Sequence, residues 1–161
     1  MGDAQIIDGK VLAPAVKARV KEAVAELKAK HGLTPGLGVV LVGNDPASEV
    51  YVRNKHMATI EAGMNSFEYK MPATSSEAEV LAKVAELNAN PYIHGFLVQF
   101  PVPDQISQQA VIDAIDPAKD ADGLHPDGWQ AACLPWCLQR PRGASSWRVM
   151  RAAAILRASM R

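Results

Sequence analysis

The sequence has no excess of charge of either sign, little cysteine and no long apolar run. Lysine and arginine total 17, as do aspartate and glutamate, among 161 residues, so no overall field attracts nucleic acid or an anionic membrane. Cys133 and Cys137 are too few for a disulfide framework, and nothing near them completes a metal site. No segment has the roughly eighteen apolar residues of a membrane span, and residues 1–5 do not open a secretory signal. We therefore expect a cytoplasmic protein with one domain, no bound metal, and no membrane or nucleic-acid partner.

The balanced charge results from two unlike segments. Residues 1–127 contain all seventeen acidic residues and eleven basic ones, a net charge of −6, whereas residues 128–161 contain six arginines and no acid. The second segment also holds both cysteines and all three tryptophans. A basic tail can be a nucleic-acid arm, but such arms are usually lysine-rich and poor in tryptophan. We expect residues 1–127 to form the folded domain, and residues 128–161 to be disordered, weakly docked or weakly helical.

Apolar residues recur with two different periods along residues 1–127. Between Val16 and Leu27 they recur at steps of three and four, which predicts an amphipathic helix that ends at Gly32. The apolar, β-branched run at 36–42 favours a strand buried on both faces. The predicted elements are helix 12–31, strand 36–42, helix 48–62 with Ser48 as its N-cap, strand 65–70, a helix from Thr74 or Ser75 to Leu87, strand 95–99 and helix 105–114. This alternation indicates an α/β fold, with a parallel sheet flanked by helices in three layers.

Three polar residues follow the first predicted strand, at the edge where parallel sheets bind ligands. Ser48, Tyr51 and Lys55 are spaced by three and four residues, so they share one face near the amino end of a predicted helix. An aromatic ring can stack on a flat heterocycle, and a lysine near the positive end of a helix suits acid/base chemistry. The alternative, which spacing alone favours, is that Tyr51 packs against the sheet and Lys55 is a solvated surface lysine.

A second and a third polar cluster follow the last predicted strand. Gln99 ends that strand, and Pro101 and Pro103 stiffen the loop that leaves it. Further along, the carboxylates of Asp120 and Asp122 can bind a metal, a ribose, or the N–H groups of a heterocycle. The alternatives are that Gln99 only caps a turn and that the aspartates belong to a turn-rich connector.

Taken together and in order, these motifs resemble the catalytic signatures of the bifunctional methylenetetrahydrofolate dehydrogenase/cyclohydrolases. The motifs are Gly43-x4-Ser48-x2-Tyr51-x3-Lys55, residues 97–103 (LVQFPVP), and residues 119–123 (KDADG) followed by His125 and Pro126. The resemblance covers residues 5–127, including the opening IDGK at 7–10. It implies that residues 1–127 form the folate-binding catalytic domain of such an enzyme.

The resemblance also implies a role for each site residue. Lys55 is the general acid/base, Gln99 positions Lys55, Tyr51 stacks on the folate ring system, and Asp122 holds the pterin. The remaining residues of the implied folate site are Ser48, Val98 and Phe100. The implied reactions are hydride transfer from methylenetetrahydrofolate to NADP and hydrolysis of the methenyl product to formyltetrahydrofolate. They belong to one-carbon metabolism, which feeds purine and amino-acid biosynthesis, and the implied enzyme is a cytoplasmic homodimer.

The resemblance stops near Gly128, where the family continues into a linker and a Rossmann-type domain that binds NADP. No glycine-rich phosphate loop occurs in this sequence, so we expect NADP not to bind this chain well and dehydrogenase activity to be lost. Codons for residues 134–141 (LPWCLQRP), read in a shifted frame, permit the family's linker sequence PALVPATP. We therefore hypothesise that a frameshift replaced the segment after about Asp127, which resequencing of the locus would test.

Two rival interpretations use the same residues differently. In the first, the chain is a folate-binding or interaction fragment without catalysis, and titration of folate fluorescence with and without residues 128–161 separates the two. In the second, it is a generic nucleotide-binding domain, which the missing phosphate loop disfavours.

Overall fold

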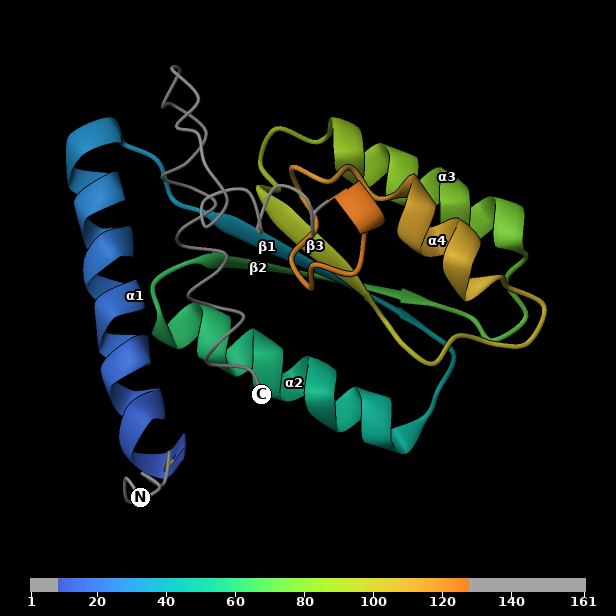
Figure 1. Cartoon of the computed structure of the whole chain (residues 1–161), viewed down its shortest axis with the longest axis horizontal. Coiled ribbons are helices and arrows are strands. Elements are labelled where there is room, and N and C mark those ends of the chain that lie inside the picture. Colours follow the sequence, from blue (N-terminus) through green and yellow to red (C-terminus); the bar gives the residue numbers. More distant parts are fainter. Residues whose placement is uncertain (1–8, 128–161) are drawn as a thin grey trace, which may run out of the picture.

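The computed structural model describes residues 9–127 of the chain (Figure 1). The predictions made for residues 128–161, including Cys133 and Cys137, lie outside the described residues. The elements are α1 (Gly9–His31), β1 (Gly36–Val42), α2 (Pro46–Glu61), β2 (Asn65–Met71), α3 (Glu77–Ala89), β3 (Gly95–Gln99) and α4 (Gln108–Ala114). Figure 1 shows α1 and α2 on one side of the sheet and α3 and α4 on the other. The predicted three-layer α/β architecture is confirmed.

The sheet has three parallel strands in the order β2-β1-β3. β1 lies in the middle and all seven of its residues are buried, as its uninterrupted apolar run predicts. Side chains alternate across the sheet, so Val39 and Leu41 pack on the α2 side and Val40 on the α3 side. In the ladder between β1 and β3, Leu41 is paired with Gln99. The sheet therefore brings the end of β3 beside the end of β1, from which the chain continues into α2.

The hydrophobic core is divided by the sheet. The larger part lies on the α3 and α4 side and includes Val80, Val84, Leu87, Phe96 and Val111, all fully buried. The part on the other side consists of two smaller clusters, in which α1 contributes Val20 and Val24, α2 contributes Val52, and Ala62 follows directly after α2. Each fully buried valine or leucine stabilises the fold by about 1.5–3 kcal/mol. The larger cluster thus anchors the strands, and the smaller clusters set where α1 and α2 lie.

Glycines end the first two helices, as predicted, but the start of α2 differs from the prediction. Gly32 and Gly63 follow α1 and α2 with φ angles of 63° and 82°, a conformation that glycine adopts readily. The N-cap of α2 is Asp45, whose carboxylate accepts the backbone N–H of Ser48 at 2.8 Å. Ser48 is therefore a residue of the first turn and not the cap. Pro46, directly after Asp45, suits the first helical position because it has no N–H to satisfy.

The starts of α3 and α4 also differ from the prediction. α3 begins after Ser76, which forms a capping box with Glu79, and not at Thr74 or Ser75. α4 begins at Gln108 and not at 105. Gln105 lies in the preceding loop, where its amide donates to the carbonyl oxygens of Ala73 and Ser75 at 2.7 and 3.0 Å.

Within residues 9–127, no helix has both the length and the apolar character needed to cross a bilayer.

Candidate functional site

Lys55 lies on the face of α2 that packs against the sheet. The three buried residues of this helix are Ser48, Val52 and Thr59, and Lys55 falls between the last two on the same stripe. Its side chain is half-buried. The Thr59 hydroxyl donates to the backbone carbonyl of Lys55 at 2.7 Å, which satisfies the buried hydroxyl within the helix. The helix thus directs the lysine amine toward the carboxyl ends of the strands.

The amine of Lys55 meets Gln99 at the end of β3. Lys55 Nζ donates to Gln99 Oε1 at 3.2 Å, and Gln99 Nε2 donates to the carbonyl oxygen of Phe100 at 2.8 Å. The second bond decides which end of the amide faces the lysine, because only the oxygen can accept from an ammonium. Gln99 and Leu97 project to the same side of the sheet, where Leu97 packs against Val52 of α2. The strand therefore presents an oriented acceptor to one lysine.

Tyr51 lies one turn before Lys55, on the outer edge of the same face. Its side chain is 61% exposed, whereas Ser48 is only 2% exposed. This is the reverse of the alternative in which Tyr51 packs against the sheet and Lys55 is solvated. The structure instead places an open aromatic ring beside a half-buried, hydrogen-bonded amine. A flat ligand can stack on the former and be reached by the latter.

Lys55 lies beyond the first turn of α2, in contrast to the expectation that it stands near the amino end of the helix. The helix begins at Pro46, so Lys55 lies about 13 Å along the axis from its start. The favourable field of a helix end acts only within the first turn. The Lys55 amine is instead hydrogen-bonded to the side-chain amide of Gln99.

The structure separates Val98 and Phe100 from the other predicted site residues. The Val98 side chain is 2% exposed and lies in the core cluster on the α3 side, so it points away from Lys55. Phe100 is half-buried and its ring packs against the same cluster. Each can therefore contribute to the site through its main chain, as the carbonyl of Phe100 already does for Gln99.

The two aspartates of the third motif have different environments. Asp120 is 6% exposed, and its two carboxylate oxygens accept the backbone N–H groups of Gly123 and His125 at 2.8 and 3.0 Å. Asp122 is half-buried, in the loop that these bonds close. The surroundings of Asp120 were not predicted, although aspartate side chains often bond backbone N–H groups a few residues further on. Among the described residues, no three His, Cys, Asp or Glu side chains gather in a way that could hold a metal.

The amino end of α2 does not suit the phosphates of a dinucleotide. In doubly wound folds the pyrophosphate binds at the first helix amino end after a strand, on free backbone N–H groups. Here that end of α2 is occupied by the Asp45 carboxylate, whose pKa is lowered by its hydrogen bonds to Ser48. A second anion at this position would be repelled. That this chain does not bind NADP well stays a prediction.

The fold and these contacts define an α/β domain with a lysine–amide pair and an exposed aromatic ring at the carboxyl edge of a parallel sheet. Ligands of such sheets bind at this edge, and a lysine amine held there is a candidate general acid or base. The family model described as "Tetrahydrofolate dehydrogenase/cyclohydrolase, catalytic domain" matches residues 7–122. The chain belongs to this family.

Curated relatives and solved structures agree with this assignment. The chain is 76% identical over 123 residues to the bifunctional protein FolD of Parvibaculum lavamentivorans, a match that covers 76% of this chain and 41% of the relative. A 5,10-methylenetetrahydrofolate dehydrogenase from the silkworm, Bombyx mori, has a similar fold, with a TM-score of 0.77, 36% identity, and coverage of 82% of this chain and 46% of that one.

A third relative has been solved with ligands. The methylenetetrahydrofolate dehydrogenase-cyclohydrolase of Trypanosoma brucei, in complex with NADP cofactor and an inhibitor, matches with a TM-score of 0.72 and 26% identity over 97% of this chain and 63% of that one. The chain spans about two fifths of the length of the curated relatives it matches.

Proposed function

We propose that this chain supplies the folate-binding and acid/base half of a methylenetetrahydrofolate dehydrogenase/cyclohydrolase. The observation that carries the proposal is the hydrogen bond between Lys55 and Gln99 at the carboxyl edge of the sheet, in a chain that belongs to this family. Tyr51 stacks on the folate ring system, and Asp122 binds the pterin N–H groups. Ser48 and the main chain of Val98 and Phe100 complete the walls of the site.

Lys55 serves the hydrolytic step directly. Water adds to the carbon that bridges the two folate nitrogens, and the neutral amine of Lys55 accepts a proton from it. One carbon–nitrogen bond then breaks, the ammonium of Lys55 returns its proton to the ring nitrogen that leaves, and the hydroxyl proton of the adduct passes to solvent as the formyl group forms, which balances the positive charge of the methenyl substrate. The product is formyltetrahydrofolate. Gln99 holds the amine at the reacting carbon in both of its protonation states, because its oxygen accepts from either.

The oxidative step requires a hydride acceptor, for which NADP is the candidate in the whole protein. The helix end that follows β1 does not suit its phosphates, since the Asp45 carboxylate occupies it. In this proposal NADP is held by a part of the whole protein other than residues 9–127. The 161-residue chain alone then binds tetrahydrofolate derivatives without oxidising them. A homodimer remains a prediction from the resemblance.

One set of assays with the purified 161-residue chain tests this function. We expect tetrahydrofolate to bind, methenyltetrahydrofolate to disappear faster than it does spontaneously, and no NADPH to form from methylenetetrahydrofolate and NADP. The Lys55→Ala variant should still bind folate but lose the accelerated hydrolysis. NADPH production that this substitution abolishes would refute the assigned loss of oxidation.

The same assays separate the rival function of a folate-binding fragment without catalysis. In that case tetrahydrofolate binds, but hydrolysis proceeds at the spontaneous rate with or without Lys55. If tetrahydrofolate does not bind at all, both functions are wrong. A variant lacking residues 128–161 shows whether binding depends on that segment.

A further inference from the structure

We propose that Asp120 is a positioning residue that holds Asp122 in place for the folate ligand. This inference rests on the proposed function, because Asp122 is the residue assigned to the pterin. Asp120 is poorly placed for that role, since its residue is only 6% exposed and each of its carboxylate oxygens accepts a backbone N–H group. It therefore acts through the loop that it closes.

The backbone on either side of Asp120 is fixed to β3. The N–H of Phe96 donates to the carbonyl of Lys119 at 2.9 Å, and the N–H of Ala121 donates to the carbonyl of Phe96 at 3.1 Å. These two bonds form a parallel bridge between Phe96 and Asp120. Because the pairing is parallel, the chain after Asp120 runs toward the end of β3, where Gln99 meets Lys55.

Lys119 attaches the same segment to the far layer of the fold. Its amine donates to the carbonyl oxygens of Leu87 and Asn90 at 3.2 and 2.7 Å, at the carboxyl end of α3. A cation is favoured there, because the last carbonyl groups of a helix carry partial negative charge. The start of the loop is thus tied to both β3 and α3.

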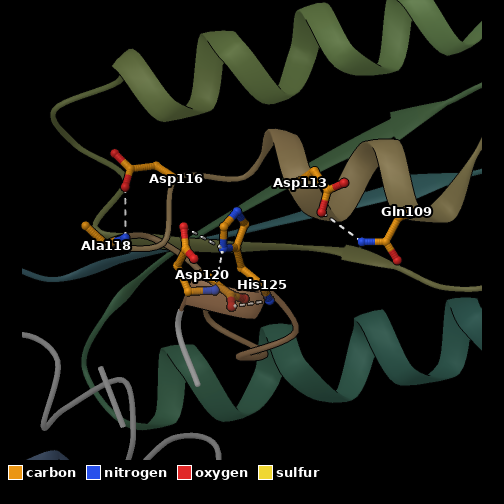
Figure 2. A network of polar contacts seen from close by, with 7 residues as sticks. Gln109, Asp113, Asp116, Ala118, Asp120 and His125 are labelled. Carbon is orange, nitrogen blue, oxygen red and sulfur yellow. Dashed lines mark hydrogen bonds and ion pairs between the residues drawn. The ribbon is translucent and has the colours of Figure 1, made fainter. Parts of the chain in front are cut away.

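The carboxylate of Asp120 then folds the next five residues back on themselves. Figure 2 shows it next to His125. One of its oxygens accepts the backbone N–H of Gly123 at 2.8 Å, and the other accepts that of His125 at 3.0 Å. Gly123 has a φ angle of 69°, which lets the chain turn between the two bonds. His125 Nδ1 accepts the N–H of Asp127 at 3.1 Å and continues the turn. Asp122 lies inside this closed loop and has little freedom to move.

A loop fixed before the ligand arrives lowers the conformational cost of binding. Asn at 120 would keep one acceptor oxygen but would aim an NH₂ group at the N–H of Gly123 or His125. One charge-assisted bond would be replaced by a donor facing a donor, and Asp122 would lose its fixed place. The substitution preserves size, so it probes the bonds rather than the packing.

The test measures tetrahydrofolate affinity of the full chain by fluorescence titration. We expect Asp120→Asn to weaken binding about tenfold, the factor that corresponds to one such hydrogen bond. The matched control is Asp116→Asn, because the Asp116 carboxylate makes a similar turn with the N–H of Ala118 at 2.8 Å (Figure 2). Asp116 is exposed and makes no part of the loop around Asp122. Equal losses in the two variants would overturn the proposal.

A double-mutant cycle distinguishes positioning from general stabilisation. If Asp120 acts through Asp122, Asp120→Asn should have little further effect on affinity in an Asp122→Ala background. An undiminished tenfold effect in that background would contradict the proposal, as would unchanged affinity in the single variant.

Amide hydrogen exchange tests the loop without any substitution. The N–H groups of Gly123 and His125 should exchange slowly in the free chain and remain slow when tetrahydrofolate is added. Fast exchange in the free chain would show that the loop is not formed beforehand, and the inference would fail. If the wild-type chain does not bind tetrahydrofolate, the proposed function itself is wrong. The exchange measurement on the free chain does not depend on that outcome.

Discussion

The amine of Lys55 and the side-chain oxygen of Gln99 lie 3.2 Å apart, although 44 positions separate the two residues in the sequence. α2 supplies the donor and β3 the acceptor, and the Phe100 carbonyl orients the acceptor. This contact is the most specific feature of the proposed site, because neither residue would hold its position without the other element.

Removing the acceptor should slow hydrolysis while leaving the fold intact. We expect Gln99→Leu to reduce the accelerated decay of methenyltetrahydrofolate by ~10- to 100-fold, since an amine that is no longer held in place reaches the reacting carbon less often. Gln99→Glu should also slow it, because a carboxylate would keep the lysine as an ammonium that cannot accept a proton. The control is Gln109→Leu, since Gln109 is exposed and its side-chain amide donates to Asp113 of its own helix. Unchanged hydrolysis in both Gln99 variants would remove Gln99 from the mechanism.

The exposed ring of Tyr51 should contribute to affinity and not to stability. Stacking of an aromatic ring on a heterocyclic base is worth about 1–3 kcal/mol, so Tyr51→Ala should weaken tetrahydrofolate binding about tenfold or more. Its urea midpoint should stay at the wild-type value, because the side chain is 61% exposed. Tyr92→Ala is the matched control, as Tyr92 is 73% exposed. A larger loss of affinity in the Tyr92 variant would place the ligand elsewhere.

His94 should make the fold less stable in mild acid. Its Nδ1 accepts the N–H of Gly36 at 3.1 Å, which a protonated Nδ1 cannot do. Burial first, and then the charge of Lys119, lower the pKa of His94 below its usual value of about 6.5, against a backbone hydrogen bond to Tyr92 that raises it. His94 therefore binds a proton more readily in the unfolded chain than in the folded chain. The contribution of this contact to the free energy of unfolding is fully present above about pH 6.5 and is lost as the pH falls through the folded-state pKa.

Urea unfolding at pH 7.5 and 5.5 measures this effect. His94→Asn keeps an acceptor for Gly36 without a titrating group, so its loss of stability in acid should be smaller than that of the wild type. His31→Asn, at the exposed end of α1, should behave as the wild type does. If the His94 and His31 variants lose stability equally, the contact with Gly36 does not couple to pH.

Gly36 should tolerate no side chain. A Cβ atom at this position would lie 2.1 Å from the backbone carbonyl oxygen of Tyr92, and a backbone atom cannot move aside cheaply. We expect Gly36→Ala to lower the free energy of unfolding by about 3 kcal/mol. Gly9→Ala, where a Cβ would meet nothing within 4 Å, should be neutral or slightly stabilising. Similar urea curves for the two variants would contradict this account.

Much of the fold could be predicted because period and composition decide it locally. The buried run of β1 and the stops at Gly32 and Gly63 are examples. The helix starts were predicted less well, since Ser48 and Asp45 are both good caps and only Pro46 distinguishes them. Thr74 and Ser76 likewise each precede a glutamate by three residues, and the choice between them depends on packing.

The candidate site could be predicted as a set of residues but not as an arrangement. Sequence spacing alone favoured a packed Tyr51 and a solvated Lys55, because it does not say which side of the stripe meets the sheet. The resemblance places Val98 and Gln99 in the same site, and only the structure shows that their side chains face opposite layers, as those of neighbouring strand residues do. Asp120 and Asp122 looked equivalent in sequence, and only the bonds to Gly123 and His125 separate their roles.

The pairing of Leu41 with Gln99 in the ladder between β1 and β3 has a consequence for how the protein folds. A slip of one residue between β1 and β3 would turn Gln99 to the α3 side and leave the amine of Lys55 without its partner. The site therefore does not form in a chain with misaligned strands, even though every residue of it is present there. The rate at which hydrolysis recovers during refolding would then report when β3 pairs with β1. This recovery should be slower than the formation of α2, whose contacts are local.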